Sequence, residues 1–168
     1  YKRLQLFKHA EAPKLDVNDL ADGDIAVFIR LGSDYKNNYY EYEVPLKLTP
    51  HGKYNYNNSE HQKIVWPAEN MLNFRLEILT DLKLERNREK RSGTNGVSFQ
   101  TVYSGRDPDN DGNTIRVKGN PSLSEVKTVM IGVRNVRNKF KSGEVWVNEL
   151  RLTDFNEEGG WAANANLN

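Results

Sequence analysis

Apolar and polar residues alternate with a period of two along much of this chain. The clearest apolar row covers residues 25–31, and a second covers residues 40–48. Alternation of this kind predicts β-strands that bury one face. The loop between the two rows is too short for a crossover helix, so the pair predicts an antiparallel hairpin. Pro45 lacks a backbone N–H, which predicts that the second strand lies at an edge or is bulged there.

Other strand patterns recur along the chain, at residues 2–9, 64–66, 97–103, 114–117, 126–136 and 145–152. Residues 70–74 are also compatible with an extended segment. Leu76, Leu79 and Leu82 have helical spacing and precede a charged stretch, which predicts a single helix. About eight strands with one accessory helix predict a mainly β fold, an antiparallel β-sandwich of jelly-roll type.

The last of these strand candidates is apolar on both faces. Trp146, Leu150 and Leu152 share one face, and Val145 and Val147 lie on the other. A strand that is apolar on both sides fits a central position in a sheet better than an exposed edge. We therefore expect Trp146 to lie in the core.

The C-terminal stretch has a different character. After a polar turn, apolar residues alternate with residues that are mostly asparagine between positions 161 and 168. Small apolar side chains opposite a polar row are typical of strands in outer-membrane barrels, although an ordinary half-buried strand or a polar tail fits too. The sequence thus predicts a β-sandwich domain over residues 1–158, followed at 159–168 by the start of a barrel strand or a tail.

Several long strings resemble one family. They are YKRLQLFKHAE at 1–11, FIRLGSDYKNNYYEYEVPLKLTP at 28–50, GNPSLSEVKTVMIGVRN at 119–135, VWVNELRLTDF at 145–155 and GGWAANANLN at 159–168. These strings resemble the SprA (Sov) family, the outer-membrane translocons of type 9 secretion in Bacteroidetes. The resemblance implies a very large barrel that passes folded cargo to the cell surface and supports gliding motility.

The resemblance also sets expectations for location and partners. It implies a structural and interaction domain inserted at the rim of the barrel, in the cell outer membrane. Long connections in such barrels usually lie outside the cell, so we expect the extracellular rather than the periplasmic face. The expected partners are the remainder of the barrel, other secretion-system proteins and secreted cargo.

Composition excludes some classes of protein. The 168 residues carry a formal net charge of +1, which argues against a broad nucleic-acid surface. The basic run at residues 83–91 is interleaved with glutamates, as on a solvated helix face. The chain has no cysteine, so it has neither disulfides nor thiolate chemistry. Tyr1 is not a start residue, and we expect the chain to be part of a longer one.

The sharpest local motif is an acidic loop. Asp107, Asp109, Asp111 and Asn113 stand at alternate positions, with a glycine in the sixth place of the loop. Oxygen ligands at this spacing suit a calcium loop, although the same residue types are favoured in solvated hairpin turns. The twelfth position is Lys118 rather than the glutamate of an EF-hand. Calcium in this loop is the one cofactor that the sequence suggests.

A second reading is a secreted carbohydrate-binding module of jelly-roll type, stabilised by that calcium. Its platform would be built from exposed aromatic residues, namely Tyr35, Tyr39, Tyr54, Tyr56 and Trp66. The simpler interpretation is that these aromatic side chains are half-buried and only support the fold.

An enzyme is not expected. The three histidines, His9, His51 and His61, do not have the spacing of a zinc motif such as HExxH. Neither Ser33 nor Ser104 stands in a nucleophile elbow. We therefore expect no catalytic residues.

Overall fold

The fold consists of two antiparallel sheets with helices beside them. The computed structural model describes residues 2–15, 19–137 and 139–154, so the predicted barrel segment 159–168 lies outside the described residues. One sheet has three strands in the order β4-β1-β8, and the other has five in the order β5-β6-β3-β2-β7. The strands are β1 (Arg3–Glu11), β2 (Ile25–Gly32), β3 (Tyr39–Pro45), β4 (Leu72–Arg75), β5 (Tyr103–Arg106), β6 (Thr114–Lys118), β7 (Thr128–Asn135) and β8 (Glu144–Thr153).

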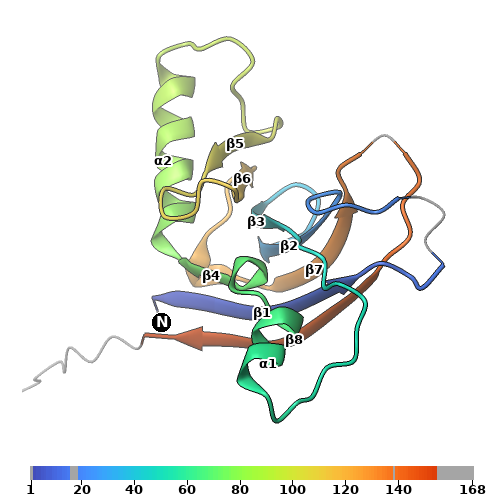
Figure 1. Cartoon of the computed structure of the whole chain (residues 1–168). Coiled ribbons are helices and arrows are strands. Elements are labelled where there is room, and N and C mark those ends of the chain that lie inside the picture. The colour runs from blue at the N-terminus through green and yellow to red at the C-terminus, as the bar shows by residue number, and fades with distance from the viewer. Residues whose placement is uncertain (1, 16–18, 138, 155–168) are drawn as a thin grey trace, which may run out of the picture.

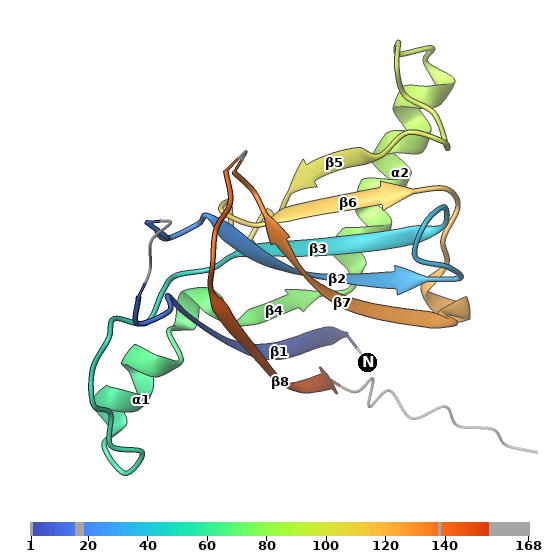
Figure 2. The ribbon, with the colours of Figure 1, turned by 90° about the vertical axis from the view of Figure 1, so that its right-hand side faces the viewer.

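Two α-helices and two 3₁₀ turns complete the described part of the chain. They are α1 (Ser59–Val65), α2 (Glu77–Arg91), η1 (Ala68–Asn70) and η2 (Leu123–Glu125). Helix α2 stands beside β5 and β6, whereas α1 lies at the opposite end of the molecule (Figure 1). Figure 2 shows the five-stranded sheet from β5 at the top to β7, with β1 and β8 of the other sheet below it.

The core lies between the sheets and under α2. It gathers apolar side chains from both sheets and from the helix, among them Leu4, Leu6, Val27, Ile29, Tyr40, Tyr42, Val44, Leu72, Phe74, Leu79, Leu82 and Val117. Tyr42 of β3 stacks on Phe74 of β4 with 3.9 Å between ring centroids. This stack joins the middle of one sheet to the edge of the other, and aromatic pairs add stability beyond the area they bury.

The mainly β class is confirmed, as are the hairpin of β2 and β3 and the helix at α2. The fold is sandwich-like, but the three- and five-stranded sheets do not show a jelly-roll order. The prediction of one helix was wrong, because residues 64–66 are not a strand and instead end helix α1. Asn58 caps that helix by accepting from the backbone N–H groups of Glu60 and His61.

Two other strand predictions need correction. Most of the predicted strand at 97–103 is irregular, and β5 begins only at Tyr103. The serine and threonine at 98 and 101 hydrogen-bond local backbone groups in that stretch, which favours turns over strand pairing. Strand β3 is central rather than an edge, and Pro45 lies past Glu43, the last residue of β3 that pairs with β6.

The prediction for the last strand was also wrong in two respects. Strand β8 is the edge of its sheet, and Trp146 is 58% exposed. The register against β1 shifts beside Glu149, which has a positive φ of 52°. This bulge inserts a residue, so Val147 lies opposite Lys8 and Leu152 lies opposite Leu4, both on the inner face. The bulge thus places on one face residues that simple alternation puts on two.

Candidate functional site

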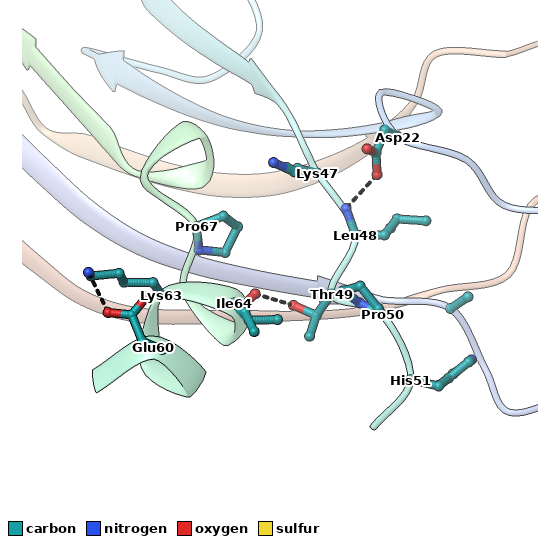
Figure 3. A pocket seen from close by; sticks show the side chains of 11 residues that line it. Asp22, Lys47, Leu48, Thr49, Pro50, His51, Glu60, Lys63, Ile64 and Pro67 are labelled. Atoms are coloured by element: carbon teal, nitrogen blue, oxygen red, sulfur yellow. Dashed lines mark hydrogen bonds and ion pairs between the residues drawn. The ribbon is translucent and has the colours of Figure 1, made fainter. Parts of the chain in front are cut away.

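A hollow opens between α1 and the segment that follows β3. It encloses about 620 Å³ and is lined by polar and apolar side chains alike. Figure 3 shows Lys63 and Glu60 of α1 on one side, with Nζ and Oε1 at 2.8 Å, and Thr49 on the other. The Thr49 hydroxyl donates to the Ile64 carbonyl at 3.4 Å and so ties the segment to the helix. His51 also lines this hollow.

His9 connects this region to the sheet below. Its Nδ1 donates to the carbonyl of Val65 at 2.8 Å and lies 3.1 Å from the Thr49 hydroxyl. Its ring lies between those of Trp66 and Trp146, with centroids 5.8 and 5.7 Å away. His9 is buried, so its contacts account for it as a structural residue that fastens α1 to β1 and β8.

The predicted aromatic platform divides into two groups. Tyr54, Tyr56 and Trp66 line a second hollow beside α1, of about 650 Å³. Tyr35 and Tyr39 belong instead to the β2–β3 hairpin and its loop, and Tyr39 is buried beneath the Arg30 guanidinium at 4.1 Å. The structure therefore brings together three of the five aromatics in one concave surface.

The acidic loop is held by protein donors. Asp107 is buried, and its carboxylate accepts from the Tyr42 hydroxyl at 2.5 Å and from the backbone N–H of Asp109 at 2.9 Å. Asp109 accepts from Arg75 Nε at 3.2 Å, and Asn113 donates to the Tyr42 hydroxyl at 2.9 Å. Burial and the Asp107 carboxylate together raise the pKa of Tyr42 far above its usual value. Asp111 lies exposed at the tip.

These contacts give the loop a structural role between β5 and β6. Within the described ranges, no group of three or more histidine and acidic side chains is arranged to hold a metal ion. The calcium site at Asp107, Asp109, Asp111 and Asn113 stays a prediction, and calorimetric titration with calcium tests it.

A cluster of charged residues covers the outer face of the five-stranded sheet. Glu41 of β3 is buried and contacts three arginines from three strands. Oxygen–nitrogen distances are 2.6 Å to Arg30, 2.7 Å to Arg116 and 2.9 Å to Arg134. Glu43 contacts Arg116 at 3.0 Å and Arg134 more closely still. The cluster links β2, β3, β6 and β7 from outside the core.

The electrostatics of Glu41 follow from these contacts. Burial by itself would raise the pKa of Glu41, but the hydrogen bond from Arg30 and the charges of Arg134 and Arg116 outweigh it. The net effect lowers the pKa below its usual value, so Glu41 is ionised at neutral pH. The cluster is therefore an ionic clamp between strands.

Lys8, unlike Glu41, is a buried charged residue without an ion-pair partner in the described part of the chain. It lies on the inner face of β1, only 1% exposed, and its Nζ has no hydrogen-bond partner in the described part of the chain. Burial lowers the pKa of Lys8 from 10.5 to about 7. A buried amine without a hydrogen-bond partner destabilises a core. Lysine is usually exposed, so its burial here could not be predicted from the sequence.

An exposed apolar row lies on β7. Val129, Ile131 and Val133 are 50%, 39% and 53% exposed. By register they lie beside Leu31, Ile29 and Val27, which belong to the core. The same face of the sheet is thus buried at β2 and uncovered at β7. Sequence reasoning identified β7 as a strand, but which strand ends the sheet depends on pairing, and alternation carries no such signal.

The fold and this uncovered row define a β-sandwich-like module with an exposed apolar row on one edge strand. The sequence profile of the family described as motility related/secretion protein (SprA_N) matches residues 1–168. The chain therefore belongs to the SprA_N family. A search of curated proteins found no match. Neither α1 nor α2 is long and apolar enough to cross a membrane, nor is any other helix in the described ranges.

Proposed function

We propose that this chain is a non-catalytic interaction domain of a type 9 secretion outer-membrane translocon. Membership of a motility and secretion family supports the assignment to a secretion system. The contacts of His9 with Val65, Thr49 and the two tryptophans support a structural rather than a catalytic use of that side chain. On this proposal the domain functions by binding other polypeptides and not by catalysing a reaction.

The observation that carries the proposal is the row Val129, Ile131 and Val133. Three β-branched side chains on one edge strand are each at least 39% exposed, although the residues of β2 that pair with them are buried. Contiguous apolar surface of this kind marks contact sites in soluble domains. We propose that a partner in the secretion machinery covers this row.

The proposed position is the rim of the barrel. Residues 159–168 have the alternation of a barrel strand and follow the sheet strand β8 after a short polar stretch. Such a junction would hold the domain close to the barrel wall, where it narrows or caps the opening and meets cargo or other secretion proteins. The extracellular side is favoured because long connections in these barrels lie there.

The test substitutes the row in the intact parent protein in its own bacterium. Ile131→Lys with Val133→Lys is expected to reduce cargo secretion and gliding while the amount of parent protein in the membrane stays unchanged. The matched control is Leu84→Lys with Val102→Lys, since these side chains are 59% and 47% exposed elsewhere on the domain. If the β7 variant secretes and glides like the control, the row has no part in function.

A second candidate function is glycan binding, favoured by the shared hollow of Tyr54, Tyr56 and Trp66. Tyr56 is 81% exposed, so its ring face is free to stack on a sugar. Binding of cell-surface oligosaccharides, followed by the chemical shifts of these three rings, tests it. Tyr56→Ala should abolish binding without unfolding the domain. If the variant still binds oligosaccharide to saturation, glycan binding at this hollow is excluded.

A further inference from the structure

The two sheets end in four edge strands, and three of them carry features that discourage further pairing. Strands β4 and β5 have only four residues each. Strand β8 is longer but is bulged near Glu149, and it carries charges at Glu144, Glu149 and Arg151. Short length, bulges and charged side chains are the usual means by which proteins prevent unwanted strand addition.

Strand β7 is neither short nor bulged. It runs for eight residues, and its register against β2 is continuous from Thr128 to Asn135. It contains no proline, and its single charged residue, Arg134, is bound to Glu41 and Glu43 on the outer face. Within the described residues β7 pairs with β2 alone, so its other edge presents main-chain groups beside an exposed apolar row.

The chain segment that contains β7 carries charge of one sign. Residues 127–141 contain five cations and no aspartate or glutamate, in a chain whose net charge is +1. Arg134, Arg137 and Lys141 are paired with buried carboxylates of β3 and of Asp24. Lys127 and Lys139 remain exposed before and after the strand. A ligand that follows β7 therefore meets positive charge at both ends.

We propose that β7 accepts an additional β-strand from an acidic, extended segment of a partner polypeptide. This inference rests on the proposed role of the β7 row as a contact surface, and it specifies the chemistry of what binds there. Main-chain hydrogen bonds join the added strand to the free edge of β7. Its alternate apolar side chains cover Val129, Ile131 and Val133, while carboxylates near its ends approach Lys127 and Lys139.

The experiment uses the full chain and a labelled peptide of strand length. The peptide has valine at alternate positions, threonine between them and glutamate near both ends, and a control peptide carries lysine in place of glutamate. Fluorescence anisotropy should show the acidic peptide binding about tenfold or more tightly than the basic one at low salt. Amide exchange should slow at β7 on binding and stay unchanged at β5.

Variants separate the contribution of the apolar row from that of the flanking lysines. Ile131→Lys should weaken binding about tenfold or more, because a charge then faces the apolar row of the peptide. Lys127→Glu with Lys139→Glu should weaken it about three- to tenfold and remove its salt dependence. Leu84→Lys, which leaves β7 intact, should bind like the unmodified chain, and circular dichroism confirms that each variant is folded.

Three results would overturn the inference. The first is equal binding of the acidic and basic peptides, and the second is unchanged binding by Ile131→Lys. The third is absence of binding by the chain until Trp161→Asp is introduced, which would mean that residues 155–168 occupy the edge themselves. None of these results bears on whether the β7 row is needed for secretion, so failure of strand addition remains distinct from failure of the proposed function.

Discussion

The two ends of the five-stranded sheet differ in what covers their inner face. At one end α2 lies over β5 and β6, and Leu82 and Ile115 are 4% and 3% exposed. The fit there is close, since a Cβ added to Gly105 would lie 2.6 Å from Leu82 Cδ1. At the other end Ile131 of β7 is 39% exposed and its neighbours in the row are more so. One sheet thus has a covered end and an open end.

The difference shows that the two ends are held by different forces. The covered end is stabilised by the burial of apolar side chains, whose contribution is proportional to the area removed from water. The open end has backbone pairing with β2 and, on the outer face, the ionic contacts of Arg134 with Glu41 and Glu43. A strand fixed from outside can leave its inner row free for a partner.

The largest expected effect comes from removing the outer clamp. Glu41→Ala leaves three arginines around an empty position, and breaking a buried ion pair in this way destabilises by about 3–5 kcal/mol. Chemical denaturation measures the loss. The control, Glu125→Ala, removes an exposed glutamate and should change stability little. A loss below about 1 kcal/mol would show that the cluster does not hold the open end.

The clamp also predicts a dependence on pH. Because the folded-state pKa of Glu41 is lowered, its contribution is present above the usual glutamate pKa and is lost as pH falls through the folded value. Stability of the unmodified chain should therefore fall on acidification more steeply than that of Glu41→Gln. Parallel curves for the two proteins would contradict the assigned role.

The covered end gives the next largest effect. Leu82→Ala removes a side chain that is 4% exposed and packed against β5, so we expect a loss of about 2–4 kcal/mol. Leu84→Ala, on the exposed face of the same helix, is the matched control. Similar small losses for both would mean that α2 covers this end without packing tightly on it.

Lys8 tests the middle of the sandwich. Replacing it with methionine removes an amine that folding must desolvate, so we expect the free energy of unfolding to rise by up to about 4 kcal/mol at neutral pH. The sign follows from its lowered pKa: the folded state gains stability as pH rises from about 7 toward 10.5. That rise should be present in the unmodified chain and absent from Lys8→Met. Thermal unfolding of both proteins at pH 7 and at a higher pH measures whether stability rises in each.

Much of the strand pattern could be predicted from the sequence, because alternation reports which face of a strand is apolar. The hairpin of β2 and β3 and the helix α2 were predicted in this way. Trp146 was misplaced because a bulge at Glu149 reverses the alternation, and a positive φ at a glutamate has no sequence signal. Residues 64–66 were misread because a short apolar run fits a strand or the end of a capped helix equally well.

The candidate sites were harder to predict for a related reason. The acidic loop and the aromatic residues are recognisable by type, yet only the fold shows that Tyr54 and Trp66 line the same hollow while Tyr35 does not. The open row on β7 depends on pairing order, which joins residues more than 90 positions apart, such as Val27 and Val133. Local pattern cannot report contacts of that range.

The smallest effect is expected at the open end itself. Ile131→Ala removes apolar atoms that are already partly in water, so we expect a loss of about 1 kcal/mol or less, against the larger loss for Leu82→Ala. Chemical denaturation of both variants under identical conditions measures the difference. Addition of the acidic strand peptide should widen the effect of Ile131→Ala, because binding buries the side chain and adds its contribution to the complex. If Ile131→Ala costs as much as Leu82→Ala without the peptide, the row is already covered and the contrast between the ends disappears.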